Sequence, residues 1–268
     1  MECWLIDTFC DADHLGNPAG VALTSDEHIA TEELQATARR LALPTTAFAR
    51  PVGDGSYRIR WFTPKRELNL CGHATIATAG FLYERKIVPH KKRLTFATSF
   101  GALHAMYRAP GRVALDLPTL QVSPRDPPAG LEAALGSAIV KCSRSVDDIV
   151  VELATEAEVA DLKPHFEAMM GFDCRGHVVT AASERAGVDF VSRSFFPALG
   201  VDEDQVCVSA HCKLARYWGA RLGKTDLCAL QLSERGGRLE LRLEGDRTFV
   251  TGHVRVSHVL QHHNKGEA

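Results

Sequence analysis

The chain has 268 residues and a mass of 29.3 kDa, which is enough for one large domain or two medium ones. Apolar residues make up 45% and charged residues 24%, values typical of a globular protein and far from those of disordered or collagen-like chains. With a formal net charge of −2 and no basic run longer than Lys91-Lys92-Arg93, the chain lacks the basic surface that nucleic acid binding needs.

The sequence shows neither a leader nor a membrane-spanning segment. Its start lacks a basic stretch followed by an apolar one, and no stretch approaches about 18 apolar residues. We therefore expect a cytoplasmic protein with no membrane partner. The eight cysteines, with no Cys-x-x-Cys and no paired Cys/His spacing, are expected to be mostly buried thiols and to form no metal site.

The first half predicts a sheet around one buried helix. Tyr57–Phe62 alternates apolar and basic side chains, as a strand with one buried face does, and Thr63-Pro64 ends it. After a polar stretch and Cys71-Gly72-His73, residues 74–82 are apolar or small on every side, which predicts a helix buried all round. Short alternating or apolar segments predict the neighbouring strands: 3–8, 21–23, 94–98, 103–107 and 113–117.

The second half repeats this order of elements. Residues 188–195 predict a strand, and a second helix is expected to open at Ser209. The two strand ends share Arg-x-Phe-x-Pro, as Arg60–Pro64 and Arg193–Pro197, and the arginines lie 133 positions apart (193 − 60), half the chain. This offset predicts an internal duplication.

Turn-forming residues predict how the two halves are divided. The proline-rich segment 118–130 predicts a boundary between lobes at residues 1–117 and 118–262, with 263–268 as a frayed tail. Arg235-Gly236-Gly237 lies between two apolar segments and predicts a hairpin turn.

Five groups of residues then occur in a specific order along nearly the whole chain. They are Asp7-Thr8-Phe9 with Gly16–Val21, Arg60–Pro64, Glu67 with Leu70–Thr75, Glu203-Asp204 with Ser209–His211, and Gln231-x-Ser233-x-Arg235-Gly236-Gly237. In this order they resemble the PhzF-like isomerases of phenazine biosynthesis, which are related in fold to diaminopimelate epimerase and proline racemase.

The resemblance implies an α+β fold of two pseudo-symmetric lobes, each a curved, mostly antiparallel sheet or barrel wrapped around a central helix, with the active site between them. Both helices would begin at that site, near Cys71-Gly72-His73 and near Asp204–Ser209, so that their N-termini bind an anion. The implied reaction moves a proton between carbons of a small anionic, carboxylate-bearing metabolite, with no metal and no organic cofactor. A homodimer is the implied assembly.

Carried over residue by residue, the resemblance assigns catalysis to Asp204, His73 and Cys71 and substrate binding to Thr45, Gly72, Ser209 and Asn17. Structural alternatives remain open, with His73 bonded to local backbone and Asp204 serving as a helix N-cap. Cys71 lies in a Cys-Gly motif like that of the racemases, whereas PhzF-like isomerases often carry this cysteine without using it as a base.

The sequence departs from the family at its catalytic glutamate. The family motif Leu-Ser-Glu-Thr-Ala-Phe is Leu43-Pro44-Thr45-Thr46-Ala47-Phe48 here, so Thr45 stands where glutamate is expected. A hydroxyl cannot shuttle a proton near neutral pH, and losing a positioned acid/base typically slows a reaction by about 10²–10⁴-fold.

The second lobe departs as well. Relatives read Glu-Asp-Pro-x-Thr-Gly-Ser-Ala-His, and Val208 replaces their glycine, which we expect to weaken or reshape the anion site. Cys207 lies in this loop, but the second thiol of a racemase is expected nearer Gln205.

Three functions remain open from the sequence. The first is a PhzF-like isomerase of altered mechanism, and the second is a racemase or epimerase that uses Cys71 and perhaps Cys207. The third is a catalytically inactive binding or regulatory protein that keeps the ligand site and has lost the chemistry.

Overall fold

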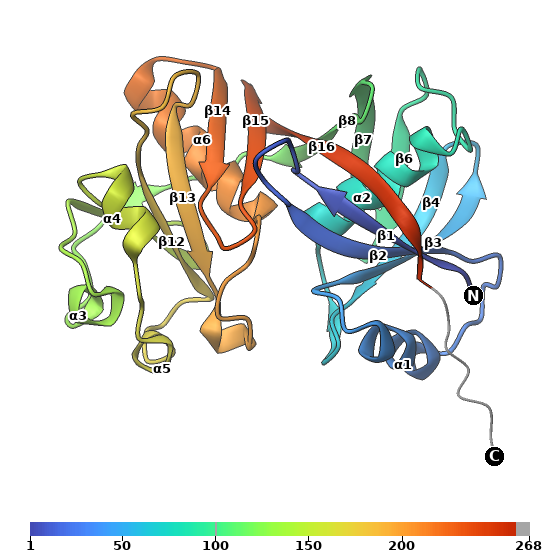
Figure 1. Cartoon of the computed structure of the whole chain (residues 1–268), viewed down its shortest axis with the longest axis horizontal. Coiled ribbons are helices and arrows are strands. Elements are labelled where there is room, and N and C mark those ends of the chain that lie inside the picture. The colour runs from blue at the N-terminus through green and yellow to red at the C-terminus, as the bar shows by residue number, and fades with distance from the viewer. Residues whose placement is uncertain (100, 261–268) are drawn as a thin grey trace. The chain divides into compact units, whose positions relative to one another are not determined.

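The structure, a computed structural model, describes residues 1–99 and 101–260 (Figure 1). The predicted tail, residues 263–268, lies outside the described residues. Within the part of the chain that is described, no helix is long and apolar enough to cross a membrane.

The chain divides into two compact units. Unit 1 consists of residues 1–8, 18–115 and those from Gly252 onward, and unit 2 consists of residues 9–17 and 116–251. The division at residue 115 lies close to the predicted boundary, but the units are not continuous along the chain as the lobes 1–117 and 118–262 would be. The reason is β16 (Arg247–Leu260), which begins in unit 2 and pairs at its far end with β1 (Cys3–Thr8) of unit 1.

Unit 1 is a closed barrel. Among its described residues the strand order is β1-β2-β3-β4-β6-β7-β8-β16, and the antiparallel pairing of β16 with β1 closes these eight strands into a ring. Helix α1 packs on the barrel through Leu34 and Ala38, in one cluster with Phe48 and Phe62. The remaining bounds are β2 Asn17–Leu23, α1 Thr31–Leu41, β3 Thr46–Gly53, β4 Ser56–Phe62, β5 Glu67–Leu68, β6 Leu94–Thr98, β7 Gly101–Ala109 and β8 Arg112–Pro118.

Helix α2 (Gly72–Glu84) runs inside this barrel (Figure 1). Every residue from His73 to Tyr83 is buried, so the prediction of a helix buried all round is confirmed. Gly80 permits the close approach of α2 to β16, because a Cβ atom at this position would lie 2.4 Å from Val254 Cγ1.

Replacing Gly80 with alanine is expected to lower the free energy of unfolding by about 1–3 kcal/mol, as overpacking of a dense core does. The strain outweighs the gain of about 1 kcal/mol that alanine brings to a helix interior. Denaturant unfolding of the native chain and the variant measures the difference. The double variant Gly80→Ala/Val254→Ala removes the clash and should recover part of the loss, whereas native stability of the single variant would contradict this account.

Unit 2 is a sheet covered on both faces. Its strand order among the described residues is β16-β15-β14-β13-β12-β11-β10-β9. Along β13, Val191 and Phe195 pack in one cluster with the short helices α3 to α5, while Phe190 and Ser192 contact α6. The bounds are β9 Ser123–Pro124, α3 Leu131–Leu135, β10 Lys141–Arg144, β11 Asp148–Glu152, α4 Glu156–Asp161, α5 Phe166–Met169, β12 Gly176–Ala182, β13 Phe190–Phe195, the 3₁₀ turn Pro197–Leu199, α6 Val208–Leu222, β14 Asp226–Gln231 and β15 Gly237–Glu244.

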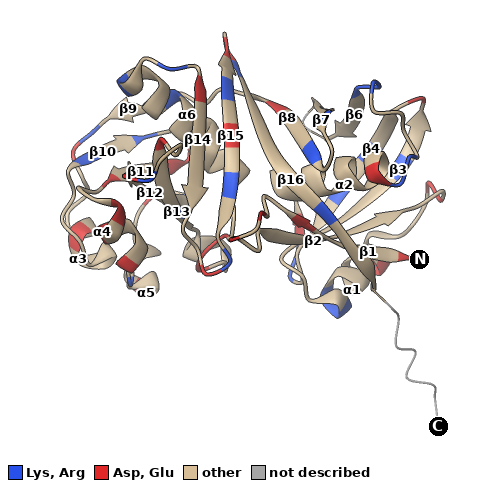
Figure 2. Ribbon diagram, turned by 45° about the horizontal axis from the view of Figure 1, so that its top comes forward, with Lys and Arg blue, Asp and Glu red and all other residues tan. Residues whose placement is uncertain are grey.

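Helix α6 is buried less completely than predicted. Most of its N-terminal residues are buried, but Leu222 at its C-terminal end is exposed. The hairpin turn predicted at residues 235–237 joins antiparallel β14 and β15 and is confirmed. Figure 2 shows basic and acidic residues alternating along β15, which has one buried and one exposed face over most of its length.

The two units repeat the same pairing pattern. Parallel β2–β3, antiparallel β3–β4, parallel β4–β6 and antiparallel β6–β7 recur as β11–β12, β12–β13, β13–β14 and β14–β15, with α2 and α6 as the matching crossover helices. The Arg-x-Phe-x-Pro repeat also recurs in its contacts. Arg60 binds Glu67 through two hydrogen bonds of 2.7 Å and lies 5.0 Å from the Phe62 ring centre. Arg193 binds Glu203 through two of 2.8 Å and lies 5.0 Å from the Phe195 ring centre. These shared contacts support the duplication.

Candidate functional site

The first group of predicted site residues lies in unit 1, where β3 and α2 begin. Cys71 is the N-cap of α2, and its Sγ lies 3.4 Å from His73 Nδ1 and 3.6 Å from Thr45 Oγ1. All three side chains are almost fully buried, with 7% of Cys71, 7% of His73 and 2% of Thr45 exposed. The structure thus brings together a hydroxyl, a thiol and an imidazole, which we call the Cys71 cluster.

The local backbone fixes this geometry. Cys71 is extended, with φ −145° and ψ 104°, so that the chain turns into α2 at Gly72. The carbonyl of Thr45 accepts a hydrogen bond of 2.9 Å from Gly20 N, which holds the residue before β3 against β2. Because the first N–H groups of a helix have no partner within the helix, the α2 N-terminus adds a partial positive charge beside the Cys71 cluster.

The second group lies in unit 2, in the loop before α6. Asn17 is buried, and its Nδ2 donates to Asp204 Oδ1 at 2.8 Å and to Val206 O at 3.1 Å. Asn17 therefore orients the Asp204 carboxylate. The proposed N-cap role of Asp204 is wrong, because the N-cap of α6 is Cys207 and the loop continues for three residues after Asp204.

The motif that begins at Gln231 holds this loop in place. The Gln231 carboxamide donates from Nε2 to Asp204 O and accepts at Oε1 from Cys207 N at 2.9 Å. Ser233 Oγ donates to Gln205 O at 2.6 Å. The sequence comparison singled out this motif but assigned it no role; only the folded loop shows that it positions Asp204.

Cys207 occupies the place in unit 2 that Cys71 occupies in unit 1. Each is the N-cap of its buried helix, and Cys207 Sγ lies 3.4 Å from Ser209 Oγ, as Cys71 Sγ does from His73 Nδ1. This equivalence differs from the register predicted around Gln205. Burial, and then the charge of Asp204, raises the pKa of the Cys207 thiol to about 12, so that it is protonated at neutral pH.

A group of charged residues near the start of α6 was missed by the sequence reasoning. Asp148 and Lys213 are fully buried and form an ion pair, and Lys213 Nζ also lies 2.9 Å from Asp147 Oδ1. Arg175 binds Asp148 on one side and donates from Nη2 to Ser209 Oγ at 3.2 Å on the other. A lysine within the predicted buried helix was the signal that a buried acid had to face it.

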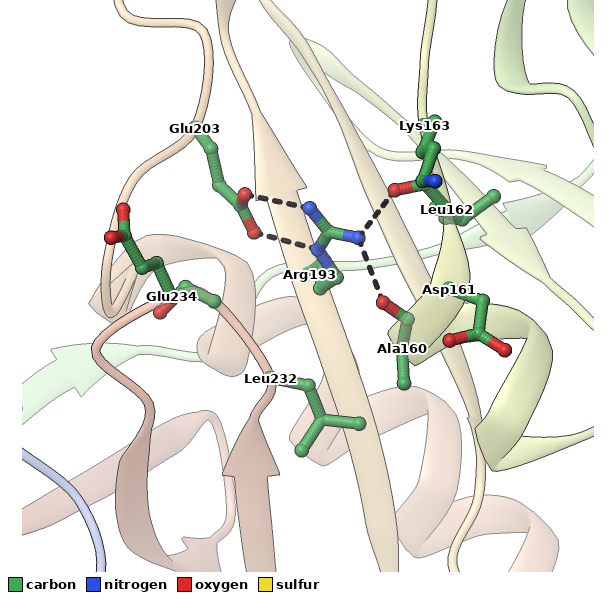
Figure 3. A pocket seen from close by; sticks show the side chains of 9 residues that line it. Ala160, Asp161, Leu162, Lys163, Arg193, Glu203, Leu232 and Glu234 are labelled. Carbon is green, nitrogen blue, oxygen red and sulfur yellow. Dashed lines mark hydrogen bonds and ion pairs between the residues drawn. The ribbon is translucent and has the colours of Figure 1, made fainter.

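A surface pocket of about 420 Å³ lies elsewhere in unit 2 (Figure 3). Arg193 and Glu203 are bound to each other there, and Arg193 Nη1 also donates to Ala160 O at 3.2 Å and Leu162 O at 2.8 Å. We assign no chemistry to this pocket, because its central arginine is used in the fold. Its lining is Ala160, Asp161, Leu162, Lys163, Arg193, Glu203, Leu232, Ser233 and Glu234.

The described residues contain no group of three or more His, Cys, Asp or Glu side chains placed to hold a metal ion. None of the eight cysteines, all of which lie in the described ranges, forms a disulfide, and six of them are buried, namely Cys3, Cys10, Cys71, Cys142, Cys207 and Cys212.

Known proteins resemble the chain over most of its length. The family model described as phenazine biosynthesis-like protein (PhzC-PhzF) matches residues 6–258. An uncharacterized isomerase of Pseudomonas aeruginosa is 45% identical over 253 residues, which cover 94% of this chain and 95% of that protein.

Solved structures resemble the fold. A PhzF-family phenazine biosynthesis protein from Enterococcus faecalis matches with a TM-score of 0.89 at 36% identity, covering 97% of this chain and 98% of that one. A hydroxyproline epimerase from Agrobacterium vitis with bound trans-4-hydroxy-L-proline matches with a TM-score of 0.64 at 10% identity, covering 97% and 92%. The second likeness is one of fold alone.

Proposed function

Because the chain belongs to the phenazine biosynthesis-like family, we propose that it is an isomerase that moves a proton between two carbons of a small carboxylate-bearing metabolite. The reaction needs neither a metal nor an organic cofactor. The observation that carries this proposal is the Cys71 cluster, in which the His73 imidazole can take over the proton transfer that the family glutamate performs.

In the proposed mechanism His73 carries the proton. With the Nδ1–H tautomer donating to Cys71 Sγ at 3.4 Å, Nε2 has the lone pair of the ring. Nε2 takes H⁺ from one carbon, the electron pair of that C–H bond moves into the π system of the substrate, and the imidazolium returns H⁺ to another carbon. No oxidant or reductant is consumed, and an imidazole suits this task near neutral pH.

The other predicted residues bind the substrate. The N-terminal N–H groups of α2, with Gly72 at its first position, stabilise negative charge on the substrate, and Thr45 donates a hydrogen bond. Asp204, oriented by Asn17, polarises the polar substituents of the ligand.

Substitutions at Thr45 test whether the absence of a glutamate at this position abolishes the family reaction. We expect negligible deuterium exchange from D₂O into dihydro-hydroxyanthranilate, the family substrate, by the native chain, because the Thr45 hydroxyl cannot accept its proton and the His73 mechanism is proposed for a different acid. Thr45→Glu should produce a measurable trace by NMR, and Thr45→Gln, of equal size without the acid, should not. Rescue is partial because Thr45 is 2% exposed and the longer side chain must displace Cys71. Robust exchange by the native chain would contradict the loss of this base.

The same assay decides whether the chain is an isomerase, with proline and trans-4-hydroxyproline as further probes. Exchange into proline or trans-4-hydroxyproline supports proton transfer by the native chain. Binding of these acids without any exchange would instead favour the inactive binding or regulatory protein.

A thiol racemase is the second candidate, since Cys71 and Cys207 are equivalent N-caps. Loss of proline or hydroxyproline exchange in both Cys71→Ala and Cys207→Ala would support it. The raised pKa of Cys207 favours the isomerase instead. The homodimer stays a prediction, to be checked by light scattering.

A further inference from the structure

Arg175, directly before β12, is held in one orientation by the fold of unit 2. Its Nε donates to Asp148 Oδ1 at 2.9 Å, and its Nη2 binds both Asp148 Oδ2 and Ser209 Oγ. Its Cζ also lies 5.1 Å from the centre of the Phe196 ring. A planar guanidinium fixed by a carboxylate, a hydroxyl and an aromatic ring has lost most of its rotamer freedom before any ligand arrives.

One end of this guanidinium remains open. Nη1 donates no hydrogen bond to any residue in the described ranges, 1–99 and 101–260, and 31% of the side chain is exposed to solvent. Because Asp148 takes the Nε side, the open Nη1 lies at the end of the guanidinium that also carries the bond to Ser209.

Ser209 Oγ adds a second donor beside Nη1. It accepts the hydrogen bond from Arg175 Nη2 at 3.2 Å, and Cys207 Sγ lies 3.4 Å away. Because the Cys207 thiol is protonated and can donate to Oγ, the hydrogen of Ser209 can be donated to a ligand. Ser209 also lies in the first turn of α6, which contains no acidic residue. Two neighbouring donors, a guanidinium N–H and a hydroxyl, match the two oxygen atoms of a carboxylate.

The charges around Arg175 permit an anion. Two acids, Asp147 and Asp148, are matched by two bases, Arg175 and Lys213, so the group is neutral without a ligand. Burial lowers the pKa of Arg175, but the hydrogen bond and charge of Asp148 raise it more, and the net pKa lies above its ordinary value. The N-terminus of the 15-residue helix α6 then adds about half a positive charge.

We propose that Arg175 is a specificity-determining residue that binds, together with Ser209, a carboxylate of the substrate. The inference rests on the proposed function in taking that ligand as the substrate. It restricts the substrate to acids whose carboxylate reaches Nη1. Arg175 would also compensate for Val208, which prevents the close contact between backbone and anion that glycine allows at this position.

Binding of benzoate to the full chain, measured by isothermal titration calorimetry, tests this proposal, with benzamide as the neutral isostere. Native protein should bind benzoate and not benzamide. Arg175→Gln should weaken benzoate binding by about 10- to 100-fold, the range for a charged hydrogen bond to a carboxylate. Arg247→Gln is the matched control: Arg247 is also in unit 2, is 35% exposed and is paired with Asp116, and its loss should change benzoate affinity less than twofold.

Arg175→Lys guards against misfolding of the glutamine variant, because a lysine can still pair with Asp148. It should lose most of the benzoate affinity, since an ammonium lacks the planar fork. No benzoate binding by native protein, or native affinity in both Arg175 variants, would overturn the inference. Either result leaves the isomerase proposal in place, because that proposal is tested separately by deuterium exchange.

Discussion

Replacing His73 with glutamine should lower the rate of deuterium exchange by about 10²–10⁴-fold, with whichever of proline and trans-4-hydroxyproline the native chain exchanges. Glutamine keeps a hydrogen-bonding group near Cys71 but cannot take up a proton at neutral pH. The exchange rate at saturating acid, followed by NMR in D₂O, measures the effect on proton transfer apart from binding.

Controls distinguish a structural role of His73 from a role in proton transfer. His104 lies on β7 of unit 1, outside the Cys71 cluster. Its Nδ1 is 3.2 Å from Thr95 Oγ1. His104→Gln should leave the exchange rate within about twofold. If His73→Gln keeps the native rate, or loses exchange only in proportion to lost folded protein, His73 is not the proton carrier.

Cys71→Ser distinguishes proton transfer by the Cys71 thiol from proton transfer by the His73 imidazole. A serine hydroxyl can accept the hydrogen bond of His73 Nδ1, so the isomerase mechanism retains most of its rate in this variant. In a thiol racemase the same change removes the acid/base itself. A small loss with Cys71→Ser beside a large loss with His73→Gln is therefore the pattern that the proposed mechanism requires.

Local patterns in the sequence predicted most elements of the fold. The run of small and apolar residues in 74–82 has no polar face, which predicted a helix buried all round, and α2 is such a helix. The Arg-x-Phe-x-Pro repeat predicted a duplication whose two arginines make matching contacts with Glu67 and Glu203. The family resemblance assigned Cys71 and His73 to catalysis and Thr45 to substrate binding, and these three side chains lie together in unit 1.

Tertiary contacts account for what the sequence reasoning missed. β16 is a 14-residue strand that pairs with β15 at one end and β1 at the other, and no local pattern shows that one strand serves both units. Nor does the sequence spacing bring Asp148, Arg175 and Lys213 together, because they come from β11, the segment before β12, and α6. Charged residues are read as exposed by default, and only their packing shows otherwise.

The largest effect on stability is expected at Asp148. Asp148→Asn keeps the shape of the side chain but leaves the fully buried Lys213 ammonium without its main counter-charge. Removing one partner of a buried ion pair typically costs about 3–5 kcal/mol. We expect about 3 kcal/mol in the free energy of unfolding, the low end of that range, because Asp147 still contacts Lys213 at 2.9 Å.

Denaturant unfolding followed by tryptophan fluorescence measures this loss, since Trp218 of α6 is buried in the same unit. Asp226→Asn is the matched control, because Asp226 is exposed and lies 3.9 Å from Arg242, and such pairs contribute at most about 1 kcal/mol. Asp148→Asn/Lys213→Met removes both charges and should recover part of the stability, since the cost is that of an unpaired buried ammonium. A loss below about 1 kcal/mol in the single variant, or no recovery in the double variant, would show that Lys213 reaches solvent when its partner is gone.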